Sequence, residues 1–486
     1  MAELSNLDLN ITAILPPLLT VLAALVVMLV DMFSDDEHPL SRTVVPWIAL
    51  AGVVVAGLAS ARMWTQPAAT FQGMASSDHF ALTVNFIVLS AAGLGILLSV
   101  NSIPLLSRQV GEYYALLLLA TSGMMMMGAS TDLITVFVAL EIFSLALYIL
   151  TGFHRDNLFS TEASIKYVVL GAFASAFFVY GAALIYGAAG ATQYNAIAQS
   201  LSSGQTNLYL LYFGIALMVV GFGFKISLVP FHMWTPDVYQ GAPTPVTAFM
   251  SAATKTAGFA AFLRLLLVAV PAYQSTWGWA LAILAVVTMT WGNLAALRQS
   301  SLKRMLAYSS IAHAGYVLVA LTPGTVEGAN AALFYLFTYA FMNMGAFAIV
   351  IALEQAGEDD ALRNRAAGIA DRWPLMALAM AVFMFSLTGI PPLAGFFGKF
   401  FVFKSAVDGG FTWLAAIAMI NSAIAAYYYL RVVVAMYFEP TSSESAIERR
   451  TWSALRIGVA VSAIVTIAIG IWPSVWAGLF STTFGG

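Results

Sequence analysis

Charge is what this sequence has least of. Only 9% of its 486 residues are charged, whereas 61% are hydrophobic, and an ordinary soluble domain is roughly one quarter charged. The 20 Lys and Arg nearly balance the 23 Asp and Glu, which leaves neither a basic surface for nucleic acid nor an acidic tail. With a mean hydropathy of +0.87, the composition excludes a soluble globular protein and a nucleic-acid partner, and it indicates an integral membrane protein.

Cysteine is absent altogether. This absence excludes disulfides, thiolate-bound iron-sulfur clusters and cysteine zinc sites from the chain, so we expect no redox cofactor or metal in it. The five histidines also make a cytochrome b with paired axial histidines a poor fit. Glu3 and Asp8 stand where a signal peptide would carry Lys or Arg, so we interpret the first apolar run as a retained helix.

Long apolar runs fill most of the chain. A run such as 15 to 30 does not alternate as a barrel strand must, and one spanning helix needs about 20 apolar residues. The sequence therefore predicts an all-α polytopic membrane protein of about 14 transmembrane helices. The expected spans are 11 to 33, 43 to 63, 79 to 100, 113 to 130, 132 to 153, 161 to 188, 208 to 232, 243 to 270, 276 to 297, 303 to 322, 329 to 355, 372 to 408, 411 to 438 and 453 to 480.

The cationic residues between these spans alternate. Odd-numbered connections hold nearly all of them, whereas the even-numbered ones hold little beyond Arg62. Because short loops rich in Lys and Arg stay on the cytoplasmic side, both termini are predicted to face outward, and the number of helices is predicted to be even. The residues behind this prediction are Arg42, Arg108, Arg155, Arg298, Lys303, Arg304, Arg363, Arg365, Arg372, Arg449 and Arg450.

Two of the spans contain helix breakers. Pro230 interrupts the seventh, and 389 to 392, which reads GIPP, interrupts the twelfth. Non-helical backbone at membrane depth needs a protein or water cover, so both helices are predicted to be discontinuous at a polar cavity. Each break falls in the fourth helix of a five-helix block, helices 4 to 8 and 9 to 13, which predicts two inverted repeats. The expected domains are 1 to 112, 113 to 270, 271 to 438 and the last helix in 439 to 486.

A few charges lie well inside apolar spans, where each costs about 2.5–3.5 kcal/mol on insertion scales. Because a desolvated lysine next to a movable carboxylate can exchange its proton, this set predicts a lateral proton relay through the membrane centre. Its alternative is a set of fixed salt bridges that hold the bundle together, although one acid does not balance three bases. The candidate relay residues are Glu141, Lys225, Lys255 and Lys399, with the two nearby histidines His232 and His313.

Other polar residues have simpler explanations. Lys166 follows Glu162 by one helical turn, so an i,i+4 pair accounts for it as well as a functional role does. Arg264 is one of four charged residues near span ends, where snorkelling or anchoring is expected. Asp132 can cap the fifth helix. The run 427 to 429, which reads YYY, is interpreted as an interfacial anchor more readily than as part of a proton path.

Four stretches carry a family resemblance. Residues 222 to 246 read FGFKISLVPFHMWTPDVYQGAPTPV, and shorter matching motifs stand at 162 to 167 (EASIKY), 303 to 316 (KRMLAYSSIAHAGY) and 395 to 400 (GFFGKF). The chain resembles the antiporter-like, proton-translocating subunits of respiratory complex I, NADH:quinone oxidoreductase. It lacks the long C-terminal extension of the subunit L group, and it has Lys399 where the subunit M group typically has Glu. Both features favour a resemblance to the subunit N group.

The resemblance implies a function and a setting. It implies proton translocation coupled to quinone reduction elsewhere in the complex, with Glu141 and Lys225 as a pair, Lys166 modulating it, Lys255 connecting and Lys399 near the exit. It further implies that NADH, FMN, iron-sulfur clusters and quinone bind to partner subunits. Expected membrane partners include the antiporter-like subunit M and the small subunit K, in a bacterial inner membrane with both termini periplasmic.

Two other functions remain open from sequence. An Mrp-type cation/proton antiporter subunit would share the glutamate, the lysines and the broken helices. A passive scaffold would need none of them to titrate. The proteins that co-purify with the chain would distinguish the first alternative, and the pumping activity of lysine variants would distinguish the second.

Overall fold

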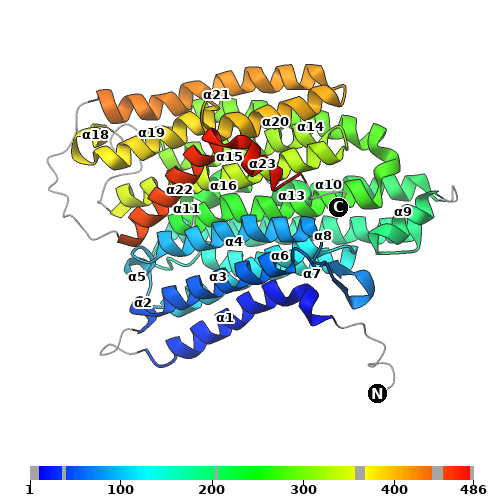
Figure 1. Cartoon of the computed structure of the whole chain (residues 1–486), viewed down its shortest axis with the longest axis horizontal. Helices are drawn as coiled ribbons and strands as arrows, with labels where there is room; N and C mark the ends of the chain where they lie inside the picture. The colour runs from blue at the N-terminus through cyan, green and yellow to red at the C-terminus, as the bar shows by residue number, and fades with distance from the viewer. Residues whose placement is uncertain (1–9, 35–39, 203–205, 356–366, 440–452, 482–486) are drawn as a thin grey trace.

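A computed structural model describes residues 10–34, 40–202, 206–355, 367–439 and 453–481. Helices lying side by side make up almost all of it, from α1 at one edge of the bundle to α21 at the other (Figure 1). The helices that precede residue 110 are η2 (Ile11–Ile14), α1 (Leu15–Asp31), α2 (Leu40–Thr43), α3 (Val45–Met63), η3 (Phe71–Gly73), α4 (His79–Ser99) and α5 (Ile103–Leu106).

The two predicted five-helix blocks follow. The first holds α6 (Val110–Ala129), α7 (Leu133–Thr151), α8 (Leu158–Ala189), α9 (Tyr194–Ser202), α10 (Leu208–Lys225), α11 (Trp234–Gly241), α12 (Thr244–Phe249), the π-helix η4 (Met250–Thr254), α13 (Lys255–Arg264) and the π-helix η5 (Leu265–Ala269). The second holds η6 (Pro271–Tyr273), α14 (Gln274–Leu297), α15 (Leu302–Leu321), α16 (Val326–Gln355), α18 (Ile369–Arg372), α19 (Pro374–Thr388), α20 (Ala394–Asp408) and α21 (Thr412–Phe438). The chain closes with α22 (Ser453–Ile471) and α23 (Pro473–Gly478).

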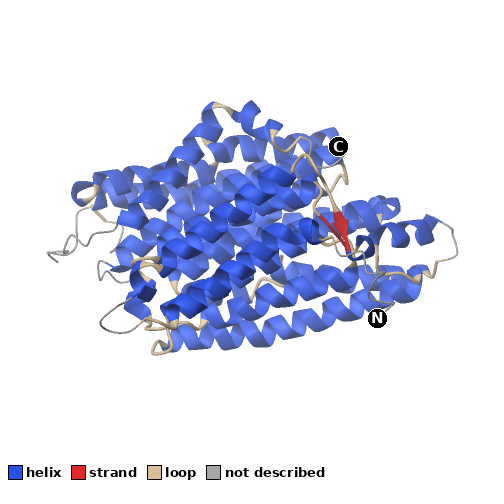
Figure 2. Cartoon of the chain, turned by 60° about the horizontal axis from the view of Figure 1, so that its bottom comes forward, coloured by secondary structure: helices blue, strands red, loops and turns tan. Residues whose placement is uncertain are grey.

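Strands are confined, within the described residues, to one short antiparallel pair. In β1 (Ala69–Thr70) and β2 (Ala75–Ser76), Ala69 stands opposite Ser76. Figure 2 shows this pair at one end of the bundle. The prediction of an all-α polytopic membrane protein is confirmed, because 12 helices of the described chain are long and apolar enough to cross a membrane.

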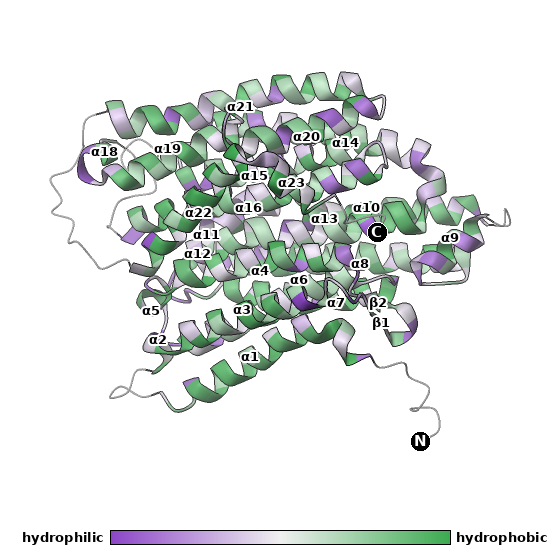
Figure 3. Cartoon of the chain, viewed as in Figure 1, coloured by the Kyte–Doolittle hydropathy of each residue, from purple (hydrophilic) through white to green (hydrophobic). Residues whose placement is uncertain are grey.

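The other two predicted spans are also helical but differ in character. Helix α15 is 20 residues long and carries Lys303, Arg304 and His313. The twelfth range is divided into α19 and α20, each of 15 residues. Hydrophobic residues dominate the other long helices, as the green ribbons of Figure 3 show.

Odd and even connections gather at opposite ends of the bundle. One end carries α2, α5 and α18, and α9 lies at the other (Figure 1). At the first end, one cavity is lined by Ser102, His154, Gln240, Lys303 and Glu354, which come from five different odd connections or their helix ends. At the second end, Ala75 pairs with Ser130, and Asp132 pairs with Gln193. Arg363, Arg365, Arg449 and Arg450 lie outside the described residues.

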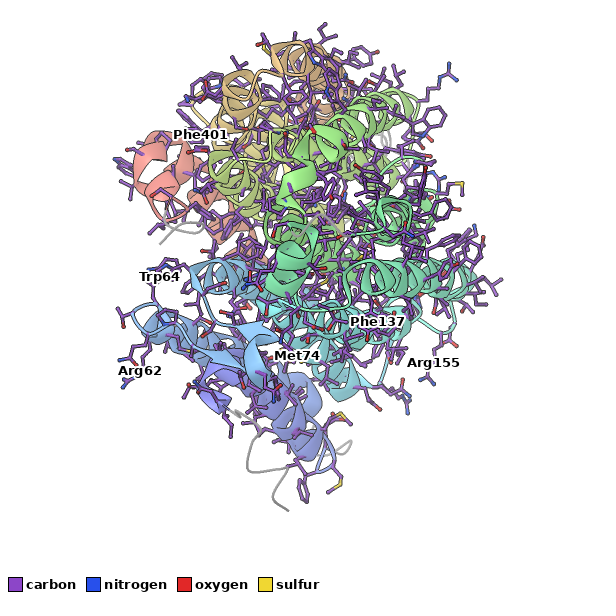
Figure 4. All side chains as sticks on the ribbon, turned by 90° about the vertical axis from the view of Figure 1, so that its right-hand side faces the viewer. Arg62, Trp64, Met74, Phe137, Arg155 and Phe401 are labelled. Carbon is purple, nitrogen blue, oxygen red and sulfur yellow. The ribbon has the colours of Figure 1, made fainter. Side chains whose placement is uncertain are left out.

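The order of neighbouring helices recurs in the two blocks. In the first, α6 packs along α7, and α8 packs along α10. In the second, α14 packs along α15, and α16 packs against both α19 and α20. The same positions of each block therefore pair, although the inverted repeat and the domain boundaries stay predictions. Figure 4 looks along the bundle and shows side chains filling the spaces between these helices.

The break in the seventh span begins earlier than the sequence indicated. Helix α10 ends at Lys225, and Ser227 has a φ of 64°. The Val229 N–H donates to Oγ1 of Thr288 at 3.1 Å, and the indole N–H of Trp234 donates to the Phe224 carbonyl at 2.9 Å. Groups exposed by the break thus find partners within the protein, as a low-dielectric setting requires.

The break in the twelfth span is built around Gly389. Its φ of 94° lies in the left-handed region that favours glycine. An added Cβ would lie 3.1 Å from Cδ of Lys399. Across the break, the Gly395 N–H donates to Oγ of Ser386 at 3.0 Å. Both predicted discontinuities are therefore present in the structure.

Candidate functional site

Glu141 lies in the middle of α7, on a face that is otherwise apolar and exposed. Its neighbours Val138, Ile142 and Leu145 are 50%, 42% and 60% exposed, whereas Glu141 itself is half-buried. Ser175 of α8 donates a hydrogen bond to Oε1 of Glu141 at 2.5 Å. A carboxylate on a lateral face of a membrane helix is costly to leave against lipid, so this position indicates a polar neighbour.

Lys225 is almost fully buried at the end of α10. Its side chain is enclosed by aromatic rings, with Nζ 5.3 Å from the ring centroids of Phe143, Tyr148 and Tyr167. The ammonium donates to Oγ of Ser144 at 2.7 Å. Ser144 follows Glu141 by three residues on α7. The structure therefore brings Lys225 to the turn of α7 that follows Glu141. Among the described residues, no ion pair within 4.0 Å joins them.

Lys255 begins α13 directly after the π-helix η4. It is 1% exposed, and its Nζ donates to the backbone carbonyl of Ser310 in α15. Single π-helical turns inside α-helices are frequent at functional sites. The chain thus places a lysine at a helix irregularity in the centre of the bundle, where α15 is its polar neighbour.

His313 joins several buried hydroxyl groups. Its Nδ1 lies 2.6 Å from the hydroxyl of Tyr335, and its Nε2 lies 2.9 Å from the hydroxyl of Tyr429. The same Tyr429 hydroxyl lies 2.5 Å from Oγ of Ser309. Because Ser309 adjoins Ser310, whose carbonyl accepts from Lys255, these groups form a nearly continuous polar connection from Lys255 to His313.

Lys399 lies in α20, the helix that follows the second break, and is 4% exposed. Its three N–H groups have three acceptors, namely the carbonyls of Leu387 and Thr388 at 3.0 and 2.8 Å and Oγ of Ser422 at 2.7 Å. The two carbonyls belong to the C-terminal turn of α19, where the helix dipole is negative. The ring centroid of Tyr316 lies 5.0 Å from Nζ, and the same ring lies 5.7 Å from that of His313.

Further buried hydroxyl groups lie around this row. The Ser310 hydroxyl lies within hydrogen-bonding reach of those of Tyr239 and Tyr339. Hydroxyl groups both donate and accept, so this cluster extends the polar surroundings of the Lys255 contact at Ser310.

Lys166 is placed apart from the buried lysines. It forms an ion pair with Glu162 at 2.7 Å, the predicted i,i+4 pair, and a second with Asp237 at 2.8 Å. Asp237 also binds Arg304 of α15 at 2.7 Å. Burial alone would raise the pKa of Asp237, but hydrogen bonds from Lys166 and Arg304 hold this pKa below its ordinary value. Asp237 thus ties α8 to α15 at the cationic end.

His232 does not join the hydroxyl network. It lies in the first break with its ring 6.2 Å from that of Trp291, which is 53% exposed. Its hydrogen-bond partner is the backbone of Pro230 in the same break. Of the two histidines singled out in the sequence, the structure therefore brings only His313 together with the lysines.

Two expectations for span-end residues need correction. Arg264 does not snorkel, because it is 4% exposed; of the two expected roles it has the anchoring one, with two hydrogen bonds to Asp78 at 2.6 and 2.8 Å. The tyrosine run is not a uniform interfacial anchor. Tyr427 is 64% exposed, whereas Tyr428 and Tyr429 are fully buried. Asp132 does cap α7, as expected, by accepting from Ile134 at 2.7 Å.

Neutral residues of the site were missed from sequence. Ser144 could have been noticed from its spacing to Glu141, but Tyr335 and Ser422 carry no comparable signal. Tyr429 was considered for a proton path, although the interfacial anchor was preferred for it. Neutral polar side chains are common in membrane helices and stand out only when their partners are known. A further partner, Asn293, donates to the Tyr316 hydroxyl at 3.1 Å and accepts from that of Tyr428 at 3.0 Å.

Known proteins share this architecture over nearly the full length of the chain. Residues 130–425 match the transmembrane family described as NADH:quinone oxidoreductase/Mrp antiporter. A chain in the structure of respiratory complex I from Thermus thermophilus with bound aureothin is 35% identical, with a TM-score of 0.81, and 97% of this chain and 100% of that chain are covered. A chain of an archaeal membrane-bound sulfane sulfur reductase is 27% identical, with a TM-score of 0.86 and 96% coverage of both chains.

The fold alone does not distinguish complex I subunits from Mrp antiporter subunits. A chain of the Mrp complex from Dietzia reaches a TM-score of 0.82 at 22% identity, covering 96% of this chain and 97% of that one, and so shares the fold. Sequence does separate them. NADH-quinone oxidoreductase subunit N of Trichlorobacter lovleyi is 47% identical, covering 96% of this chain and 94% of the relative. The protein of the same name from Chloroflexus aggregans is 46% identical, covering 95% and 94%. The chain belongs to the NADH:quinone oxidoreductase/Mrp antiporter transmembrane family, and within it to the subunit N group of NADH-quinone oxidoreductase.

Proposed function

We propose that this chain is a proton-translocating membrane subunit of an NADH:quinone oxidoreductase. Quinone reduction takes place elsewhere in the complex, and protons move through a relay formed by Glu141, Lys225, Lys255, His313 and Lys399. The enzyme is the complex, and this chain is its non-redox part. NADH, FMN, iron-sulfur clusters and quinone are assigned to partner subunits, in keeping with a sequence that has no cysteine.

The relay proposal is supported by the hydrogen-bond partners of the three buried lysines. Among the described residues, the ion pairs involve Lys166, Arg264, Lys303, Arg304 and Lys404. The three relay lysines instead bind hydroxyl and carbonyl oxygens. A set of fixed salt bridges would have paired them with carboxylates, so this arrangement favours the relay over the structural alternative. Neutral acceptors also let a lysine lose its proton without leaving an unpaired carboxylate in the membrane.

A proton can follow groups that both donate and accept. Hydroxyl groups and histidine do so, and α15 presents Ser309, His313 and Tyr316 in the interval between Lys255 and Lys399. The hydroxyls of Tyr239 and Tyr339, which lie within hydrogen-bonding reach of Ser310, extend this row. Protons are the transported species, and the relay runs across the bundle from the face of α7 to the face of α20.

The two ends of the relay support partners on opposite lateral faces. Glu141 lies on the exposed face of α7, and Lys399 lines a cavity of about 590 Å³ between α20 and α21, together with Thr388, Gly389, Phe396 and Ser422. Each charged end needs a polar cover within the membrane. We assign these faces to other membrane subunits of the complex, among them the antiporter-like subunit M and the small subunit K.

The same proposal covers the membrane and the orientation. The cationic end of the bundle, which carries α2, α5 and α18, is assigned to the cytoplasmic side by the positive-inside rule. Both termini then face the periplasm of a bacterial inner membrane. Lys166 is assigned a modulating role, because its partner Asp237 also binds Arg304 next to the relay helix α15.

The decisive experiment purifies the chain with its native partners. The proposal expects complex I subunits to co-purify, and expects NADH-driven quinone reduction to acidify or alkalinise sealed vesicles as protons move. An Mrp-type antiporter subunit would instead give sodium/proton exchange without NADH or quinone activity. The 46–47% identity to proteins named subunit N favours the first outcome.

A further inference from the structure

Asn293 is a buried amide on a helix whose other face is exposed. In α14, the nearby Trp291 and Leu294 are 53% and 48% exposed, whereas Asn293 is fully buried. Helix α14 packs along both α15 and α21 (Figure 1). A buried amide is costly unless its donors and its acceptor are bound. The partners of Asn293 therefore indicate what this side chain does.

The side-chain amide of Asn293 is bound at both ends. Its Nδ2 donates to the Tyr316 hydroxyl at 3.1 Å and to the backbone carbonyl and Oδ1 of Asn421 at 3.0 and 3.2 Å. Its Oδ1 accepts from the Tyr428 hydroxyl at 3.0 Å. Asn421 in turn donates to Oγ1 of Thr290 at 3.2 Å. The two asparagines thus fasten α14 to α21 and to the hydroxyl of Tyr316 on α15.

Two of these partners stand next to Lys399. The ring centroid of Tyr316 lies 5.0 Å from Nζ, within the range of a cation–π contact. Asn421 directly precedes Ser422, whose Oγ accepts from the same Nζ at 2.7 Å. We propose that Asn293 is a positioning residue for Lys399, and that it acts by holding the ring of Tyr316 over the ammonium. This inference rests on the relay function proposed above.

Close packing of α14 against α15 sets the level at which Asn293 meets Tyr316. A Cβ added to Gly292 would lie 2.6 Å from a backbone atom of α15, and one added to Gly315 would lie 2.7 Å from a backbone atom of α14. Glycine at both positions therefore lets the two backbones touch. Gly292 directly precedes Asn293, and Gly315 directly precedes Tyr316, so the closest approach of the helices falls beside this hydrogen bond.

The chemistry of an amide suits positioning better than proton transfer. An asparagine side chain has no titration in the physiological range, so Asn293 does not carry a proton itself. Its Nδ2 can only donate, and its Oδ1 can only accept. The amide therefore fixes the direction of two hydroxyl groups, because it donates to that of Tyr316 and accepts from that of Tyr428. The alternative is a purely structural joint between helices, with no effect on Lys399.

The test is a double-mutant cycle in the purified complex, reconstituted in sealed vesicles. Asn293→Leu keeps the branched shape but removes the amide, and Tyr316→Phe keeps the ring but removes the hydroxyl. Each should lower the NADH-driven pumping rate per assembled complex about fivefold, equivalent to about 1 kcal/mol of barrier. Because both changes break the same contact, the double variant should also be about fivefold slower. The KM for quinone should stay unchanged, since quinone binds to partner subunits.

Several results would overturn the positioning role. A loss of about 25-fold in the double variant would show that the two residues act independently. A normal rate in assembled Asn293→Leu would show that Lys399 does not depend on the amide. If Asn293→Leu does not assemble, Tyr316→Phe decides, because it removes a single hydroxyl. A normal rate there would overturn the inference, and a fivefold fall would support it.

Two controls complete the experiment. Asn85→Leu removes a buried asparagine of α4, whose Nδ2 lies 3.5 Å from Oγ of Ser60, outside the relay. This variant should pump at the normal rate. Lys399→Ala separates the inference from the proposed function. A normal rate in Lys399→Ala would contradict the relay itself, whereas a low rate there with a normal rate in Asn293→Leu would contradict only the positioning role.

Discussion

Nζ of Lys225 lies 2.7 Å from Oγ of Ser144, one turn beyond Glu141 on the same helix. The hydroxyl is therefore the side-chain acceptor for the first base of the relay. Ser144 also donates to the carbonyl of Leu140, so its oxygen is left to accept from the lysine. Because this partner is neutral, Lys225 can lose its proton without leaving an unpaired charge beside it.

Ser144→Ala should therefore slow proton uptake while leaving assembly intact. Without the hydroxyl, the ammonium of Lys225 loses its side-chain hydrogen bond. We expect a fall of roughly tenfold in the NADH-driven pumping rate, equivalent to about 1.4 kcal/mol of barrier. Ser462→Ala removes a buried serine of α22 and should pump normally. Equal rates in both variants would show that Ser144 is structural only.

Lys225→Ala and Lys399→Ala should each lower pumping and coupled quinone reduction in assembled complexes. The relay requires a titratable group at both positions, so the loss should be at least as large as for Ser144→Ala. Glu141→Gln should uncouple, and Glu141→Asp should retain part of the activity because the carboxylate remains. Vesicle acidification and NADH oxidation measured side by side provide the readout. Normal pumping in both lysine variants would leave the scaffold function.

Tyr429→Phe should disturb the relay, whereas Tyr427→Phe should not. The Tyr429 hydroxyl touches both Ser309 and His313, and phenylalanine keeps the ring while removing this junction. Tyr427 is two residues away on α21 but 64% exposed. We expect a several-fold lower pumping rate in the first variant and an unchanged rate in the second. If the two variants behave alike, the hydroxyl network carries no proton.

Asp78→Asn should destabilise the protein. Asp78 is the counter-charge of the buried Arg264 but is itself 39% exposed, so solvent screens part of the interaction and its loss should cost less than the about 3–5 kcal/mol of a fully buried pair. Lys404→Gln breaks an exposed i,i+4 pair with Asp408 and should cost only a few tenths of a kcal/mol. Thermal denaturation of the purified complex, followed by scanning fluorimetry, would compare them. Similar midpoints for both variants would contradict the assigned role of Asp78.

The same carboxylate gives stability a pH dependence of known sign. Burial opposes the charge of Asp78, but Arg264 outweighs it and holds the pKa of Asp78 below its ordinary value. Its stabilising contribution is therefore complete above the unfolded pKa of about 3.9 and is lost as pH falls through the folded value. The midpoint of denaturation should fall more steeply below about pH 4 in the wild type than in Asp78→Asn. Parallel curves would exclude this linkage.

The sequence predicted the fold well because hydrophobicity and breakers are local signals. Pro230 and the GIPP run located both discontinuities, and intramembrane charge identified Lys225, Lys255 and Lys399 as buried. The sequence contains no local signal for which side chains pair between different helices. The partner of Arg264 lies 186 residues away, and Tyr428 and Tyr429 differ from Tyr427 only in the direction that each faces on α21. Which neutral residues serve a buried charge depends on packing that the sequence pattern does not contain.

The polar residues of helix α15 affect how this helix inserts into the membrane. With Lys303 and Arg304 in its first turn, and two serines and a histidine near its middle, it is a weak substrate for insertion by hydrophobicity alone. Ser309 and His313 bind tyrosines of α16 and α21, and the Ser310 carbonyl binds Lys255 of α13, so these partners lie on both sides of α15 in the chain. Stable residence of α15 in the bilayer therefore awaits synthesis of α21, and truncation before residue 412 should leave this helix poorly inserted.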